Sequence, residues 1–210
     1  MAADPDPGGA TAAGVSDDGQ LVVGCHPHRQ FGIGLAFAWT EAAGEFHPRL
    51  DEGFLFSSSR ALSNDGRRSV GLAGKLDREF RALSWPLTTG LGILTSNGEA
   101  LPGPAAAVSG DGKVIAGSCR HQAVRWDSGE TTWLKTSGAP QASSDAFDGS
   151  TDGSTVVGTS FWIDASDSLV TAAMVWSAGG EAHLLSDLLR DAGLGADGMD
   201  VSRHGDAGFG

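Results

Sequence analysis

The chain has 210 residues, of which 32 are Gly, 26 are acidic, 14 are basic and none is Tyr. Gly is about twice as frequent as its usual share of roughly 7%, which favours many tight turns over a helical bundle. The formal net charge of −12 disfavours a nucleic-acid partner, because nucleic-acid affinity rests mainly on Lys and Arg. Since the sequence has no apolar run of about 18 residues, we also expect no insertion into a membrane.

The N-terminal segment is acidic and rich in Pro and Gly. It has neither the basic start nor the apolar centre of a signal peptide. We therefore expect residues 1–11 to form a disordered tail and residues 12–210 to form a single repeat domain.

A Ser-x-Asp-Gly sequence recurs along the rest of the chain, at residues 16–19, 63–66, 109–112 and 150–153. A degenerate copy, with His in place of Asp, stands at residues 202–205. An Asp-Gly pair between two apolar runs favours a β-hairpin with a type I′ turn. Five residues after the Gly of each copy comes a second glycine, at Gly24, Gly71, Gly117, Gly158 and Gly210.

An Ala-x-x-Trp sequence follows each of the first four copies and predicts a third strand, with a short apolar fourth strand after it. Four antiparallel strands in about 40–50 residues are the size of a propeller blade. Because one blade cannot bury both of its faces alone, we expect the blades to stack. Four indoles would then fill the spaces between blades: Trp39, Trp85, Trp126 and Trp176.

These patterns predict an all-β, propeller-like array of four four-stranded blades plus a partial fifth. The predicted units are residues 12–58, 59–104, 105–145, 146–197 and 198–210. The fifth unit stops after its second strand, and the N-terminal tail offers no strands to complete it. We therefore expect either a piece of a longer chain or an array that is not fully closed.

One segment, near residues 184–192, departs from the strand pattern and predicts a short amphipathic helix. Its Leu residues at 184, 185, 188 and 189 form an apolar stripe, and Gly193 is a natural stop. Alternatively, Leu184 and Leu185 belong to the fourth strand and Ser186 caps the helix. We expect the helix to pack on one face of the blade ring; the alternative is a helix that binds a partner.

The copy formed by Val15–Gly24 and Ala36–Thr40 resembles the HAF-type extracellular repeats of bacterial surface and exported proteins. The resemblance covers about residues 12–210. It implies a propeller-like β architecture and an extracellular or cell-surface setting. The second copy departs from the pattern at Arg68 and Ser69, and the fifth departs at His204. The Ser-x-Asp-Gly turn is also similar, more weakly, to the TolB-type propeller repeat, which lacks the Ala-x-x-Trp strand.

Candidate metal ligands are better explained in other ways, so we predict no metal and no cofactor. The four repeated aspartates fit turn formation, and the acidic stretch 145–152 lacks the spacing of a known calcium loop. Cys25 and Cys119 lie at different offsets from their glycines and in copies that are not adjacent. Strand alternation would then point the two sulfurs to opposite faces, which disfavours a disulfide or a shared zinc site.

Catalytic motifs are also absent from the sequence. It contains no Gly-x-Ser-x-Gly elbow, phosphate loop, dinucleotide fingerprint or His-Glu-x-x-His pair. We therefore predict a protein without enzymatic activity. The alternative is a hydrolase or lyase with its site in a pocket at the centre of the ring.

The segments between the second and third strands vary most in length, and variable loops on a regular scaffold are where binding usually resides. Their aromatic and Arg side chains suit contacts with a protein or a glycan. We predict a binding module; the alternative is a structural spacer. For Phe161 and Trp162, the alternative is that they only extend the second strand and pack inward. The candidate binding residues are Arg29, Phe31, Arg78, Phe80, Arg120, His121, Phe161, Trp162 and Asp164.

Overall fold

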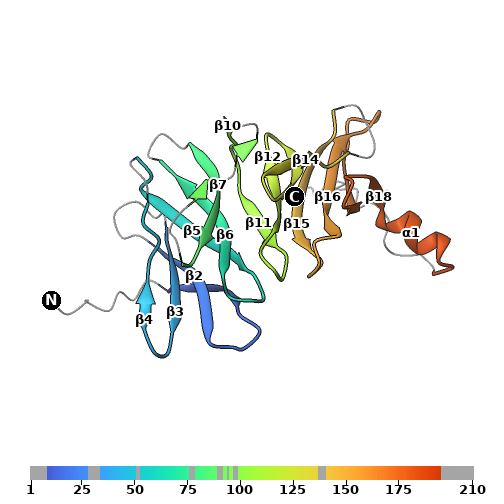
Figure 1. The fold of residues 1–210 in the computed structure, drawn as a ribbon. Helices are drawn as coiled ribbons and strands as arrows, with labels where there is room; N and C mark the ends of the chain where they lie inside the picture. The colour runs from blue at the N-terminus through green and yellow to red at the C-terminus, as the bar shows by residue number, and fades with distance from the viewer. Residues whose placement is uncertain are drawn as a thin grey trace, which may run out of the picture.

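Four antiparallel sheets follow one another along the chain and end in a short helix, as the computed structural model shows (Figure 1). The structure describes residues 9–27, 34–50, 53–75, 79–88, 92–93, 95–96, 99–136 and 141–194. Most of the predicted tail and the partial fifth unit lie outside these residues. Within them, the predicted all-β array of four four-stranded, propeller-like blades is confirmed.

Each sheet keeps its strands in chain order. Sheet 1 contains β1 (Thr11–Val15), β2 (Leu21–Pro27), β3 (Gly34–Thr40) and β4 (Gly44–Phe46). Sheet 2 contains β5 (Phe56–Leu62), β6 (Arg68–Gly74), β7 (Phe80–Pro86) and β8 (Gly92–Ile93). A small ribbon of β9 (Thr95–Ser96) and β10 (Glu99–Ala100) comes next. Sheet 3 contains β11 (Ala105–Val108), β12 (Val114–Cys119), β13 (Gln122–Asp127) and β14 (Glu130–Trp133). Sheet 4 contains β15 (Ser143–Gly149), β16 (Thr155–Ile163), β17 (Leu169–Ser177) and β18 (Ala182–Leu184).

The Ser-x-Asp-Gly turns share one hydrogen-bond pattern. In the first, the Ser16 hydroxyl donates to Asp18 Oδ1 at 2.6 Å, and the same oxygen accepts from the Gln20 amide at 3.0 Å. The amide of Gly19 donates to the Ser16 carbonyl at 2.8 Å. The equivalent Ser–Asp distances in the other three turns are 2.6, 2.8 and 2.6 Å. The four aspartates therefore hold the turns, as predicted.

The predicted turn type is wrong. A type I′ turn needs positive φ at both central residues, but among the described residues of these turns only the final glycine has it, with Gly19 at 70°. Because the Gly19 amide donates to the Ser16 carbonyl, Asp17 and Asp18 are the two central residues of the turn. The residue with positive φ, Gly19, is the last residue of the turn. Two adjacent positive φ values occur at Arg120 (50°) and His121 (66°), which join β12 to β13.

In each of the four described blades, the second glycine lies opposite a β-bulge. The register of β1 on β2 shifts between Ala12 and Gly14. The first strand pairs of sheets 2, 3 and 4 shift at the equivalent place. A Cβ on Gly24 would lie 2.1 Å from the Thr11 carbonyl oxygen. The corresponding distances are 1.9, 2.2 and 2.0 Å in sheets 2, 3 and 4. Any side chain here would collide with backbone, which explains why the glycine recurs.

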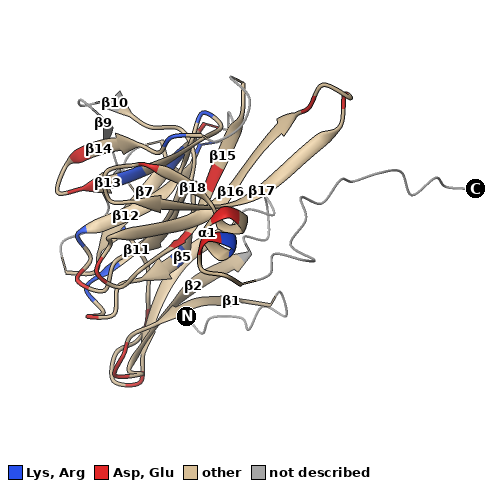
Figure 2. Ribbon diagram, turned by 90° about the vertical axis from the view of Figure 1, so that its right-hand side faces the viewer, with Lys and Arg blue, Asp and Glu red and all other residues tan. Residues whose placement is uncertain are grey.

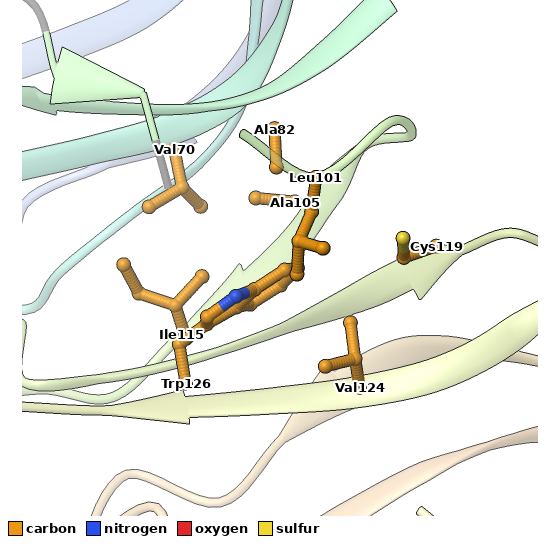
Figure 3. Packing of buried hydrophobic residues seen from close by; sticks show 8 residues of the cluster. All are labelled: Val70, Ala82, Leu101, Ala105, Ile115, Cys119, Val124 and Trp126. Carbon is orange, nitrogen blue, oxygen red and sulfur yellow. The ribbon is translucent and has the colours of Figure 1, made fainter. Parts of the chain in front are cut away.

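The core consists of three clusters, one between each pair of consecutive sheets. Trp85 of sheet 2 packs on sheet 1, Trp126 of sheet 3 packs on sheet 2, and Trp176 of sheet 4 packs on sheet 3. Figure 3 shows the Trp126 indole with Ile115 of its own sheet and with Val70 and Ala82 of sheet 2. All three indoles are at most 3% exposed.

Trp39 is the exception, because its side chain is 41% exposed. The prediction that it fills a space between blades is wrong for the described residues. Each buried indole faces the preceding sheet, and no described sheet precedes sheet 1. Trp39 pairs with Val22 on β2, on the opposite face from the buried Val23 and Ala38. It therefore lies on the outer face of the first blade.

Helix α1 (Leu185–Asp191) follows β18 directly. The alternative is confirmed in one part, because Leu184 ends the fourth strand β18. Its other part is wrong, because Leu185 begins the helix and Leu184, not Ser186, takes the N-cap position. The predicted stop is confirmed: Gly193 has φ 71° and its amide bonds the Arg190 carbonyl, while the Leu194 amide bonds the Leu189 carbonyl. The helix contacts β17 and β18 of sheet 4. No helix in the described part of the chain is long and apolar enough to cross a membrane.

Candidate functional site

The candidate binding residues within the described structure lie at the end of the sheets opposite the Ser-x-Asp-Gly turns. Phe80 begins β7, Arg120 and His121 join β12 to β13, and Phe161 and Trp162 stand near the end of β16, with Asp164 just beyond it. Arg29, Phe31 and Arg78 lie outside the described residues.

Three of these residues have local structural contacts. The Phe80 ring meets Phe56 edge-on, with ring centroids 5.5 Å apart. The exposed Arg120 and His121 form the two-residue turn of a hairpin, and the His121 carbonyl accepts from the Ser144 amide of sheet 4 at 2.9 Å. This turn therefore helps to join sheets 3 and 4.

The β16–β17 hairpin is longer than the other hairpins of the described structure and extends well past the neighbouring strands (Figure 2). Both of its strands have nine residues, whereas β2 and β6 have seven and β12 has six. Phe161 pairs with Thr171 and Trp162 pairs with Val170, and both aromatic side chains are half-buried. They extend the second strand, as the alternative interpretation predicted, but neither side chain is fully buried as that interpretation required.

Asp164 shapes the tip of this hairpin. Its Oδ1 accepts from the Ser166 amide at 2.8 Å and from the Ser168 amide at 3.1 Å. The Asp167 amide donates to the Asp164 carbonyl at 3.0 Å, and Asp167 has a φ of 60°. One carboxylate oxygen of Asp164 is thus engaged in holding the turn.

Sequence reasoning missed the most exposed apolar pair of the hairpin. Ile163 and Leu169 face each other across the last pair of β16 and β17, and they are 55% and 46% exposed. Alternation along β16 places Phe161 on the same face. We call Phe161, Ile163 and Leu169 the tip patch. Burial alternates along β17, but Leu169 and Val175 on the more exposed side are as apolar as their buried neighbours. The sequence therefore offers no signal that could have located Leu169.

A cleft of about 840 Å³ lies at the opposite end of the sheets, between the two hairpin loops of sheet 1 and the Ser-x-Asp-Gly turn of sheet 2. Trp39 forms one wall, and the carboxylates of Asp18, Glu41 and Asp65 also line the cleft. The hydrogen bond from the Ser16 hydroxyl, followed by that from the Gln20 amide, lowers the pKa of Asp18 below 3.8. Asp18 and Asp65 both hold turns, so much of the acidic lining has a structural role.

The outer face of sheet 1 also carries a His–Glu–His group that the sequence did not predict. His26 Nε2 and His47 Nε2 each lie 3.0 Å from one oxygen of the Glu45 carboxylate. The His26 ring also contacts Phe37, at 4.8 Å between centroids. Within the described ranges, no group of His, Cys, Asp and Glu side chains is arranged to hold a metal ion.

The two cysteines are free thiols in different parts of the array. The Cys25 sulfur lies 3.8 Å from the Ser57 carbonyl oxygen, at the junction of sheets 1 and 2. Cys119 is buried in the cluster between sheets 2 and 3. Cys119 therefore forms part of a core.

Comparison with known proteins gives a fold and no family. No family model matches the sequence, and no curated protein matches it. Among solved structures, the chain is similar to a putative TolB from Agrobacterium tumefaciens, with 22% identity and a TM-score of 0.56 over 81% of this chain. It is also similar to TolB from Acinetobacter baumannii, with 17% identity and a TM-score of 0.53 over 82% of this chain. The fold is propeller-like. The chain spans 62% and 42% of the lengths of those two proteins.

Proposed function

We propose that this chain is a non-enzymatic binding module of a bacterial surface or exported protein, and that it binds a protein partner through the tip patch. The supporting observation is the exposed Ile163–Leu169 pair at the end of a hairpin that extends past its neighbours. The exported or surface setting rests on the resemblance of the repeats to HAF-type extracellular repeats.

The chemistry of the tip favours a protein over a glycan. Branched aliphatic side chains gain free energy by leaving water, about 25 cal/mol for each Å² of apolar surface that is buried. A protein surface offers apolar side chains that can cover Ile163 and Leu169, whereas the hydroxyls of a glycan do not. The backbone below the pair is held by the Asp164 turn, so little ordering is needed when a partner binds.

The test is the double variant Ile163→Ser/Leu169→Ser, with Leu55→Ser as the matched control. Leu55 is exposed to the same degree as Leu169, at 47%, but lies beside β5 of sheet 2. Each protein would be crosslinked in a surface-protein extract of the producing bacterium, and captured partners would then be purified and titrated. Full burial of each apolar side chain is worth about 1.5–3 kcal/mol, so we expect the double variant to bind at least ~10-fold more weakly.

Equal binding by the double variant and the Leu55→Ser control would contradict the tip patch as the binding site. A glycan array probed with the same proteins would overturn the choice of a protein partner if the unmodified chain bound a glycan through Ile163 and Leu169. If neither screen found a ligand, the structural-spacer alternative would replace this proposal.

A further inference from the structure

Each blade has two unlike faces. One presents the indole of the Ala-x-x-Trp strand. The other, which we call the receiving face, presents the residue before the second glycine together with the residues one and three places before the Trp. In each of the four sheets, the residue before the second glycine pairs with the residue before the Trp. Val23 pairs with Ala38 in sheet 1, and Val157 pairs with Val175 in sheet 4.

The receiving faces of the first three sheets are buried against the indole face of the next sheet. All of their residues are at most 8% exposed; they are Val23, Ala36, Ala38, Val70, Ala82, Ser84, Ala116, Ala123 and Arg125. The equivalent residues of sheet 4 are not covered in this way. Val157 is 40% exposed, Ala173 is exposed and Val175 is half-buried.

The described structure thus leaves Trp39 exposed on the indole face of sheet 1, where Phe37 is buried beside the His26 ring. On the receiving face of sheet 4 it leaves Val157 and Ala173 exposed. These are the two surfaces whose counterparts meet at every internal junction of the array. Sheets 1 and 4 stand at opposite ends of the array (Figure 1). A second copy of the chain carries the matching face for each.

Backbone contacts between turns repeat in the same direction. The Asp17 amide donates to the Asn64 carbonyl at 3.2 Å, the Asp65 amide to the Gly110 carbonyl at 3.1 Å, and the Gly110 amide to the Thr151 carbonyl at 2.7 Å. Each of the first three sheets therefore donates from its Ser-x-Asp-Gly turn to the turn of the next sheet. Continuing this pattern would lead from the Thr151 turn of one copy to the Asp17 turn of another.

We propose that two copies of the chain associate head to tail, with Trp39 of one copy packed against the receiving face of sheet 4 of the other. The contact is heterologous, so it generates a ring where the rotation closes and an open array where it does not. Two copies supply eight sheets, within the range of about four to eight blades found in closed propellers. The expected product is a dimer in which both end faces are covered.

The two faces can be blocked separately by Trp39→Asp and Val157→Asp. Both side chains are exposed to water, so these substitutions are compatible with the folded monomer, which circular dichroism would verify. Sedimentation velocity of the full chain at rising concentration should show dimers or larger species. Each variant alone would form fewer or smaller complexes, while a Leu55→Asp control, outside both faces, should behave like the unmodified chain.

Mixing the two blocked variants gives the decisive measurement. A Trp39→Asp copy keeps an intact sheet 4, and a Val157→Asp copy keeps an intact sheet 1, so the mixture should form a complex through one good contact. A tagged copy of one variant would retain the other only if the contact is head to tail. An isologous contact, in which the same face meets itself, would not be restored in this way.

The proposal is overturned if the unmodified chain stays monomeric at all concentrations, or if mixing restores nothing. It is also overturned, in favour of residues 195–210 as the cover for sheet 4, if only a chain truncated after Leu194 associates. The tip patch continues the same face of sheet 4, because alternation along β16 places Phe161 and Ile163 on the side of Val157. Separate variants distinguish the two proposals: Ile163→Ser/Leu169→Ser tests partner binding, and Val157→Asp tests association of two copies. Val157→Asp should leave binding at the tip patch unchanged.

Discussion

Trp126 and Trp39 occupy the same place in two copies of one repeat, yet one is 3% exposed and the other is 41% exposed. Sheet 2 covers Trp126, whereas no described sheet covers Trp39. The contrast separates two kinds of information in a repeat. Features that form within a blade are present in every copy, but burial of the indole depends on the neighbouring blade.

The largest expected effect follows from this contrast. Trp126→Ala removes a buried indole and should lower the free energy of unfolding by about 3–5 kcal/mol. Trp39→Ala should lower it by less than about 1 kcal/mol, because an exposed side chain leaves no cavity. Urea unfolding of both variants, at a dilution where the chain is monomeric, measures the difference. Equal losses would show that Trp39 is buried in solution.

The second prediction concerns a feature formed within each blade. Gly24→Ala and Gly117→Ala place a methyl group 2.1 Å from the Thr11 carbonyl oxygen and 2.2 Å from the Pro104 carbonyl oxygen. We expect each substitution to lower the free energy of unfolding by at least about 1–3 kcal/mol, as overpacked sites do. The loss should be similar in the outer sheet 1 and the inner sheet 3. Gly9→Ala is the control, because its methyl group meets nothing within 4 Å. Unfolding curves would contradict this interpretation if Gly24→Ala matched the control.

The third prediction compares two buried indoles. Trp176 Nε1 donates to the Lys135 carbonyl at 2.7 Å, whereas the buried Trp126 Nε1 has no hydrogen-bond partner among the described residues. Replacing Trp by Phe should therefore cost about 1 kcal/mol more at Trp176 than at Trp126. The comparison uses the difference between the two melting transitions, and an equal cost would assign a partner to Trp126 in solution.

The smallest expected effect is a pH dependence of the turns. The Ser150 hydroxyl, then the Ser154 amide and hydroxyl, lower the pKa of Asp152 from 3.8 to about 2. In this window the unfolded chain binds more protons than the folded chain, so stability falls as the pH falls from about 4 towards 2. Asp152→Asn should make the melting temperature less dependent on pH there.

The same turn in the outermost blade provides the matched comparison. The Ser16 hydroxyl lowers the pKa of Asp18 as well, so Asp18→Asn should flatten the pH profile in the same direction. The measurement is a series of thermal melts for the two variants and the unmodified chain. A flattening confined to one of the two variants would show that the turn depends on its neighbouring blade.

Much of the fold can be predicted because it is local. The turn aspartates, the strand alternation and the stop at Gly193 act within a few residues of each other. The type of the first turn could not be predicted, because the Ser16 hydroxyl changes which residue takes the positive φ. The bulge that requires Gly24 is also invisible in the sequence, since it depends on how β1 registers with β2.

The candidate site was predicted less well. The β16–β17 hairpin, which carries three of the predicted binding residues, does extend past its neighbours. The sequence could not show that Asp164 holds its turn, or that Ile163 and Leu169 pair with their side chains exposed. Whether an apolar strand residue is covered depends on the next sheet. The meeting of His26 with Glu45 and His47 likewise requires the pairing of strands from different segments.

The contacts between neighbouring turns connect main-chain atoms, and the positions involved hold different residue types: Asp17, Asn64, Gly110 and Thr151. At the first junction the side chains add a second bond, because Asn64 Nδ2 donates to Asp17 Oδ1 at 2.8 Å. At the third junction there is no room for a side chain, because a Cβ on Gly110 would lie 2.6 Å from the Thr151 side chain. The main chain therefore sets the spacing of the blades, and the residue type at each junction follows from the room that this spacing leaves for a side chain.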